Sequence, residues 1–176
     1  MPTKTIATLA LLAALSFGGH AMAQQGGVEV GGNLTNTTLL NQSTNAAIGL
    51  GAAANTRVGS IQSTTVGGNL TNTTLVNRNT NAAIGLGARA TTHLGTITGS
   101  NVGGNLTNTT LVNQNTNAAI GLGARAGTAI GTISNATVGG NLTNTTLVNR
   151  NTNAAIGLGA VACSEIGTIG KSDVCG

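Results

Sequence analysis

The apolar positions along the chain follow one pattern that repeats every 36 residues. Each copy opens V-G-G-N-L-T-N-T-T-L, continues after a short variable stretch with T-N-A-A-I-G-L-G-A, and recovers as G-[ST]-I. The four copies begin at Val30, Val66, Val102 and Val138. A fixed period of this length predicts a repeat architecture in which each unit packs on its neighbours.

Short runs of Thr, Val, Ile and Leu between Gly and Asn predict β-strands in every copy. Helical repeats are disfavoured because the chain holds 28 Gly and many Asn and Thr, which are poor in helix interiors. In the second copy the pattern predicts strands over residues 69–77, 82–88 and 94–98. The expected turns lie at 67–68, 78–81 and 89–93, where Asn and Gly tolerate tight turns.

Alternation within the predicted strands assigns their faces. In the strand over 69–77 both faces mix polar and apolar residues, so the pattern leaves open which face points inward. One face of that strand holds Leu70, Asn72, Thr74 and Val76. The strand over 82–88 has one fully apolar face, and we therefore expect it to be the best core strand. That face holds Ala82, Ile84, Leu86 and Ala88.

Three short strands per copy suit one coil of a β-solenoid, although the sequence leaves open whether 36 residues make one coil or two. The predicted fold is therefore an all-β repeat solenoid of four units. The units cover 30–65, 66–101, 102–137 and 138–176, after a short leader at 24–29. Stacking places each residue over its equivalent, so Asn over Asn predicts side-chain amide ladders. It also predicts an inward core ladder of Ile48, Ile84, Ile120 and Ile156.

The N-terminal residues have the form of a secretory signal peptide. Residues 6–17 are apolar or small, and Ala21-Met22-Ala23 is an A-x-A box. We expect a signal peptide over 1–23 with cleavage after Ala23. A membrane anchor is the alternative, but the run is shorter than the roughly 20 residues that a spanning helix needs. No later segment is apolar enough, so we expect no transmembrane segment and a bacterial protein that is secreted, extracellular or at the cell surface.

Beyond residue 23 the chain has no Pro, Phe, Trp or Tyr. Aromatic stacking usually supports single-stranded nucleic-acid sites, and this chain has none to offer. The basic residues are scattered rather than clustered, so we expect no nucleic-acid partner. They are Arg57, Arg78, Arg89, Arg125, Arg150 and Lys171, against the acidic Glu29, Glu165 and Asp173.

The candidate chemical residues are few. Cys163 and Cys175 lie in the last copy of an exported chain, which predicts a disulfide. A redox pair or a metal pair is the alternative, but the spacing is not C-x-x-C and no ligand cluster accompanies the cysteines. His93 has no nucleophile or carboxylate partner in the pattern, so we expect a solvated turn residue. We therefore expect no catalytic, cofactor or metal site, and a protein that is not an enzyme.

The signal peptide, the Asn-, Gly- and Thr-rich repeats, the absence of proline and the small aliphatic residues together resemble bacterial functional-amyloid subunits of the curli type. The resemblance covers organisation, since the spaced Ser, Gln and Asn of curli repeats are absent here. It implies a secreted subunit that adds coil upon coil into an extracellular fibre. Its expected partners are further copies of itself and components of secretion or nucleation.

Physical argument points the same way, because a four-coil stack without proline or acidic edge residues in its first three copies has undefended edges. The predicted function is therefore a secreted structural protein that self-assembles into fibres or biofilm matrix. One alternative is a monomeric cell-surface adhesion module. Another is an ice-binding β-solenoid, because T-N-T triplets such as Thr35-Asn36-Thr37 recur once per copy.

Overall fold

The structure is a computed structural model that describes residues 28–170, and all of its regular elements are β-strands. The first coil contains β1 (Val28–Val30), β2 (Leu34–Ile48), β3 (Ala53–Val58) and β4 (Ile61–Gln62). The second contains β5 (Thr64–Val66), β6 (Leu70–Ile84), β7 (Arg89–Leu94) and β8 (Ile97–Thr98). The third contains β9 (Asn101–Val102), β10 (Leu106–Ile120), β11 (Arg125–Ile130) and β12 (Ile133–Ser134). The fourth contains β13 (Thr137–Val138), β14 (Leu142–Ile156) and β15 (Val161–Ile166).

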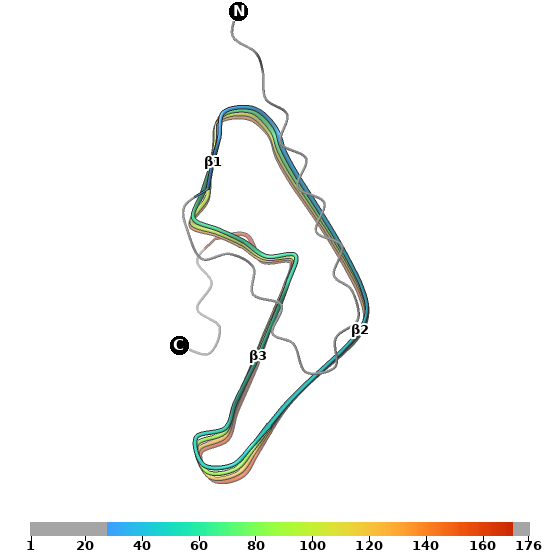
Figure 1. Cartoon of the computed structure of the whole chain (residues 1–176), viewed down its shortest axis with the longest axis vertical. Helices are drawn as coiled ribbons and strands as arrows, with labels where there is room; N and C mark the ends of the chain where they lie inside the picture. Colours follow the sequence, from blue (N-terminus) through green and yellow to red (C-terminus); the bar gives the residue numbers. More distant parts are fainter. Residues whose placement is uncertain (1–27, 171–176) are drawn as a thin grey trace, which may run out of the picture.

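Equivalent strands of successive coils pair in parallel and form four sheets. The longest sheet has the order β14-β10-β6-β2, and its register pairs each residue with the one 36 positions away, as Leu70 with Leu106. The other sheets keep the same offset, so the coils superimpose when the molecule is viewed along the stack (Figure 1). The predicted all-β solenoid is confirmed, and each 36-residue copy makes one coil.

The outline of a coil is a long loop with a re-entrant corner between β3 and β4 (Figure 1). Gly59, Gly95 and Gly131 occupy this corner with φ of 59°, 61° and 63°. A Cβ on Gly95 would collide with the side chain of Thr110, which faces it from the long sheet. Glycine is therefore needed here both for its conformation and for the close approach of the two walls.

The strand boundaries differ from the predicted ones. The predicted strand over 69–77, the predicted turn at 78–81 and the first residues of the predicted strand over 82–88 form the single strand β6, which ends at Ile84. The predicted strand over 94–98 is interrupted at Gly95, between β7 and β8. The polar residues at 78–81 do not mark a turn, because the side chains of Asn79 and Asn81 point into the interior, where both are buried. The predicted turn at 89–93 is likewise wrong, since it forms β7. The chain instead turns at Gly85 and Gly87, which have positive φ, while the Gly67–Gly68 turn is confirmed.

The alternation of β6 shifts by one residue at its middle, where Asn77 and Arg78 are both exposed. The shift leaves Ile84 facing outward and brings Ala83 inward. The predicted inward isoleucine ladder is therefore wrong in its direction: its members are stacked in register but are exposed by 80%, 41%, 39% and 58% along the stack. These are Ile48, Ile84, Ile120 and Ile156.

The core consists of three apolar clusters within one coil outline. The first is built from alanine alone, including Ala83, Ala88 and Ala90, which explains why isoleucine does not fit inside that narrow end. The second surrounds Leu70 and Ile97 near β1, β4 and the start of β2. The third lies between them and contains Val58, Val76, Leu94, Val112 and Ile130. Buried asparagines lie on the same strands as these clusters, as β6 shows.

Candidate functional site

Ladders of asparagine side chains run through the interior along the stack, as the stacking of equivalent residues predicts. Asn72 is fully buried and donates from Nδ2 to Asn108 Oδ1 at 2.8 Å and to the Gly59 carbonyl at 3.0 Å. Asn108 donates in turn to Asn144 Oδ1 at 2.9 Å and to the Gly95 carbonyl at 3.1 Å. Each amide therefore joins successive coils and also satisfies a carbonyl at the re-entrant corner.

Two more inward ladders run in the same direction. Asn45, Asn81, Asn117 and Asn153 form one, with Nδ2 to Oδ1 distances of 3.1, 2.9 and 3.0 Å. The other joins Asn79, Asn115 and Asn151 at 2.8 Å per step. Ser43 occupies the first-coil position of this second ladder. The buried Oδ1 of Asn79 consequently has no hydrogen-bond partner.

An exposed ladder runs in the opposite direction on the outside of the long sheet. Asn77 donates to Asn41 Oδ1 at 2.9 Å, Asn113 to Asn77 at 3.0 Å and Asn149 to Asn113 at 2.9 Å. The stack is therefore directional in its side chains as well as in its backbone. Its first-coil end and its fourth-coil end present different groups in the same columns.

The two end coils leave core positions partly exposed. Leu70 and Leu106 are fully buried, whereas their equivalents Leu34 and Leu142 in the first and fourth coils are half-buried. The contrast is larger at Ile166, which is 47% exposed although the equivalent Ile130 is fully buried. Within residues 28–170 every strand is part of one of the four stacked sheets, and none is left to cover an end of the stack. Both ends therefore expose apolar interior.

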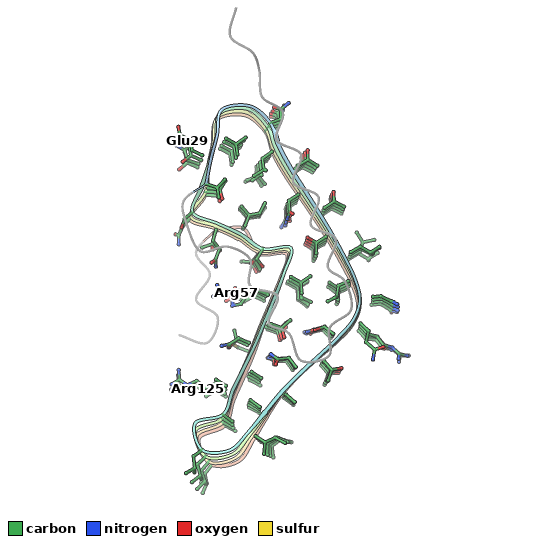
Figure 2. The ribbon with its side chains drawn as sticks, in the orientation of Figure 1. Glu29, Arg57 and Arg125 are labelled. Atoms are coloured by element: carbon green, nitrogen blue, oxygen red, sulfur yellow. The ribbon has the colours of Figure 1, made fainter. Side chains whose placement is uncertain are left out.

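Charged residues of the described chain lie in four outward columns. In one of them Arg89 stacks on Arg125, and another holds Glu29 beside Thr65. The remaining two bear on how copies could dock. In the long sheet Gln and Arg alternate through Gln42, Arg78, Gln114 and Arg150, and Arg78 Nε donates to Gln114 Oε1 at 3.2 Å. The sheet of β3, β7, β11 and β15 stacks Arg57, His93, Ala129 and Glu165. Arg57 points into the re-entrant corner, where Nη1 donates to Gln62 Oε1 at 3.0 Å (Figure 2).

The predicted solvated turn histidine is wrong, because His93 lies in β7 and is half-buried. Burial of the ring, followed by the positive charge of Arg57, lowers the pKa of His93 from 6.5 to about 4. The ring is therefore neutral at neutral pH. It is a structural neighbour of Arg57 in the stack.

Threonine and aliphatic columns cover the rest of the long sheet's outer face. The T-N-T triplets place their two threonines outward and the asparagine inward, as in Thr71 and Thr73 around Asn72. Leucine columns follow, and at the Gly85–Gly87 turn Ile84 and Leu86 form an exposed ridge, 41% and 49% exposed. The equivalent residues of the other coils extend both features along the stack.

Several predicted sites are only partly within the described residues. Cys163 lies in β15, while Cys175 and the cleavage position Ala23 lie outside residues 28–170, so the disulfide and the cleavage stay predictions. The described residues hold no group of three or more His, Cys, Asp and Glu positioned for a metal ion. No helix within 28–170 is long and apolar enough to span a membrane.

Comparisons with protein families, with curated proteins and with solved structures found no match to this chain. The protein is thus defined by its class, a parallel β-solenoid with one 36-residue coil per repeat. Sequence reasoning missed the direction of the asparagine ladders and the alternation shift at Asn77. The inward role of Asn72 was one of two open choices, because polar and apolar residues alternate on both faces of its strand.

Proposed function

We propose that this protein is a secreted structural subunit that self-assembles into extracellular fibres or biofilm matrix by stacking coil on coil. The observation that carries the proposal is the pair of open coil ends. Both ends expose residues that are fully buried one coil further in, as Ile166 shows against Ile130. A second copy in the same register would cover these residues and continue the ladders of Asn72, Asn81 and Asn77. In the remaining ladder Ser43 would follow Asn151.

The two long edge strands lack the features that protect an open edge, while the shorter edge strands β1, β3 and β15 each carry one charge, namely Glu29, Arg57 and Glu165. β2 carries no charged residue and no proline, and β14 carries only Arg150, which points outward. Soluble β-proteins usually defend an open edge with charge, proline or a bulge that interrupts pairing. Identical residues stacked in parallel, with asparagine ladders between them, are the arrangement found in self-propagating cross-β assemblies.

The test uses the mature chain and a matched pair of lysine variants in the fourth coil. Ile166→Lys places a charge on the end surface, where the side chain is 47% exposed in the single chain and would be buried by the next copy. Thr152→Lys places the same charge outward on β14. We expect negative-stain microscopy to show fibres for the parent and Thr152→Lys but none for Ile166→Lys.

Circular dichroism must show that both variants retain the parent's β-structure. Fibres of Ile166→Lys at the parent's rate would contradict assembly through this end. A parent chain that stays monomeric for days at high concentration would contradict the proposed function itself and leave the monomeric adhesion module.

The secreted location and the disulfide rest on the sequence and have their own test. We expect mass spectrometry of exported protein to find a chain that starts at Gln24 and carries no free thiol. Closure of the loop between Cys163 and Cys175 is worth roughly 3 kcal/mol in the chain-entropy model. A main form that retains Met1, or two free thiols in exported protein, would contradict these proposals.

Ice binding is the second candidate, and the outward threonines favour it. Thr71 and Thr73 lie two residues apart on the same face of a strand, and their columns continue through all four coils. The array would present hydroxyl and methyl groups about 4.8 Å apart along the stack. Thermal hysteresis by the parent that Thr73→Lys abolishes and the outward control Thr80→Lys preserves would establish this activity.

A further inference from the structure

We propose that the partner of the fourth-coil end is the first-coil end of a second copy, docked head to tail with every column in register. The inference rests on the proposed self-assembly and adds its polarity and its contacts. In this docking the first-coil residues of the incoming copy follow the fourth-coil residues of the preceding one. Arg57 then follows Glu165, and Gln42 follows Arg150.

The direction of the asparagine ladders selects this polarity. In the inward ladders each Nδ2 donates toward the next coil, as from Asn36 to Asn72 at 2.7 Å. Asn144 Nδ2 donates to the Gly131 and Gly167 carbonyls, and in the next coil it would also face an acceptor, as Asn108 Nδ2 does. Asn36 presents its Oδ1 as that acceptor at the other end. Head-to-tail docking joins donor to acceptor in that column.

The exposed ladder gives the same answer although its direction is opposite. Asn41 accepts from Asn77 through Oδ1, so its Nδ2 is on the side of the incoming contact. Asn149 donates to Asn113 and keeps its Oδ1 for the next copy. A junction in register therefore joins donor to acceptor in the ladders of Asn72, Asn81 and Asn77. In the remaining ladder Asn151 meets Ser43, whose hydroxyl can accept a hydrogen bond. Reversing one copy breaks the parallel pairing that all described coils use.

The glutamine and arginine column continues its alternation across the junction. Within the chain Gln42, Arg78, Gln114 and Arg150 alternate, and Arg78 bonds Gln114 in the next coil. Gln42 of the incoming copy would follow Arg150 and restore the same neutral and cationic order. Two adjacent arginines do not occur in this column, whereas Arg89 and Arg125 are adjacent in the column of β7 and β11. The alternation is therefore a property of this column alone.

The charged column in the sheet of β3, β7, β11 and β15 supplies a charge pair that occurs only at the junction. Arg57 lies in the first coil and Glu165 in the fourth, separated by His93 and Ala129. Within one chain these two charges are three coils apart, or about 14 Å at the usual strand spacing. Docking in register brings them to adjacent levels, about 4.8 Å apart. Opposite charges on adjoining surfaces set orientation and speed encounter.

Apolar columns close at the same contact. The third core cluster runs through Val58, Leu94 and Ile130 to the partly exposed Ile166. Val58 of the incoming copy would cover Ile166, and Leu40 would cover Val148 in the same way. The junction therefore resembles an ordinary step between coils, except that Ser43 follows Asn151 and that one charge pair is added.

The experiment uses two charge-reversed chains that are blocked alone and complementary together. Arg57→Glu would place glutamate against Glu165 of its own kind, and Glu165→Arg would place arginine against Arg57. We expect each variant alone to elongate about tenfold more slowly than the parent, because like charges then meet at every junction. In an equimolar mixture the two variants can alternate along the fibre, and every junction then pairs opposite charges. The mixture should therefore recover the parent's rate, with both variants in each fibre.

Three results would overturn the docking while parent fibres still form. Either variant could elongate alone at the parent's rate, or the folded variants could fail to assemble when mixed. If a reversed variant does not fold, the neutral variants Arg57→Gln and Glu165→Gln replace it. Added salt should slow the growth of parent fibres but not the growth of the glutamine variants. Glutamine variants that respond to salt as the parent does would overturn the pairing. Absence of parent fibres would instead contradict the proposed function.

Discussion

Removal of one buried asparagine tests what holds successive coils together. Asn108 is fully buried, receives a hydrogen bond from Asn72 and donates to Gly95 and Asn144. Asn108→Ala leaves the Gly95 carbonyl and Asn144 Oδ1 without this donor, while Asn72 keeps its bond to Gly59. A buried group left unsatisfied costs about 1–3 kcal/mol, so we expect a loss of about 2–5 kcal/mol in the free energy of unfolding.

Asn113 is a matched control because it lies on the same strand and in a ladder of the same chemistry. It donates to Asn77 at 3.0 Å and accepts from Asn149 at 2.9 Å, but it is exposed. Water replaces these bonds in Asn113→Ala, so we expect a change within about 0.5 kcal/mol.

The assay is urea unfolding of each monomeric variant, followed by far-ultraviolet circular dichroism at a concentration below that of assembly. The midpoint of Asn108→Ala should fall with little change in slope. Equal losses in the two alanine variants would refute the reasoning, because burial would then not distinguish the ladders. A loss below about 0.5 kcal/mol for Asn108→Ala would refute it as well.

Three further changes have defined outcomes. Ser43→Asn supplies a donor for the unpartnered Oδ1 of Asn79, so urea unfolding should show a gain of about 1 kcal/mol. Gly95→Ala collides with the opposite wall and should prevent folding by circular dichroism, whereas Gly87→Ala, with positive φ but an open surrounding, should cost about 1–2 kcal/mol. The low pKa of His93 in the folded chain means that protonation favours the unfolded chain. The free energy of unfolding should therefore fall as the pH drops from 6.5 to about 4, by up to about 2 kcal/mol for a partly exposed ring. His93→Gln should flatten this part of the pH profile of stability.

The repeat period was sufficient to predict the solenoid, because exact recurrence in the sequence becomes stacking in space. Recurrence of asparagine at the same repeat positions likewise predicted the asparagine ladders, which join equivalent residues in successive coils. Stacking of equivalent asparagines follows from the repeat whichever face of the strand is buried. Periodicity along the chain therefore determined the axial arrangement better than it determined the cross-section.

The cross-section was harder because an apolar face is usually buried, and here one is exposed. Ile84 and Leu86 form the more apolar face of their segment, yet the space opposite them is narrow and accepts only Ala83, Ala88 and Ala90. The alternation shift beside Asn77 that reverses their direction leaves no mark in a simple two-residue period. Buried asparagines compounded the error, since their side chains suggest a turn until the stacked partners are known.

The candidate ends were predictable only in outline. The sequence indicates a short stack without defended edges, but the polarity of the ends depends on the directions in which the asparagine amides donate. Those directions are opposite for the inward Asn72 and the outward Asn77. The pairing of Arg57 with Glu165 likewise requires a register of one coil per repeat, which the sequence left open.

Cryo-electron microscopy of fibres grown from the purified mature chain tests end-to-end coil stacking most directly. Four coils per copy at the parallel strand spacing predict an axial rise of about 19 Å per subunit. End-to-end stacking predicts this rise, one polarity for all subunits, and a cross-section equal to one coil outline. A fibre with strands paired between reversed copies, or with a different number of coil levels per subunit, would contradict it, as would a chain that remains monomeric.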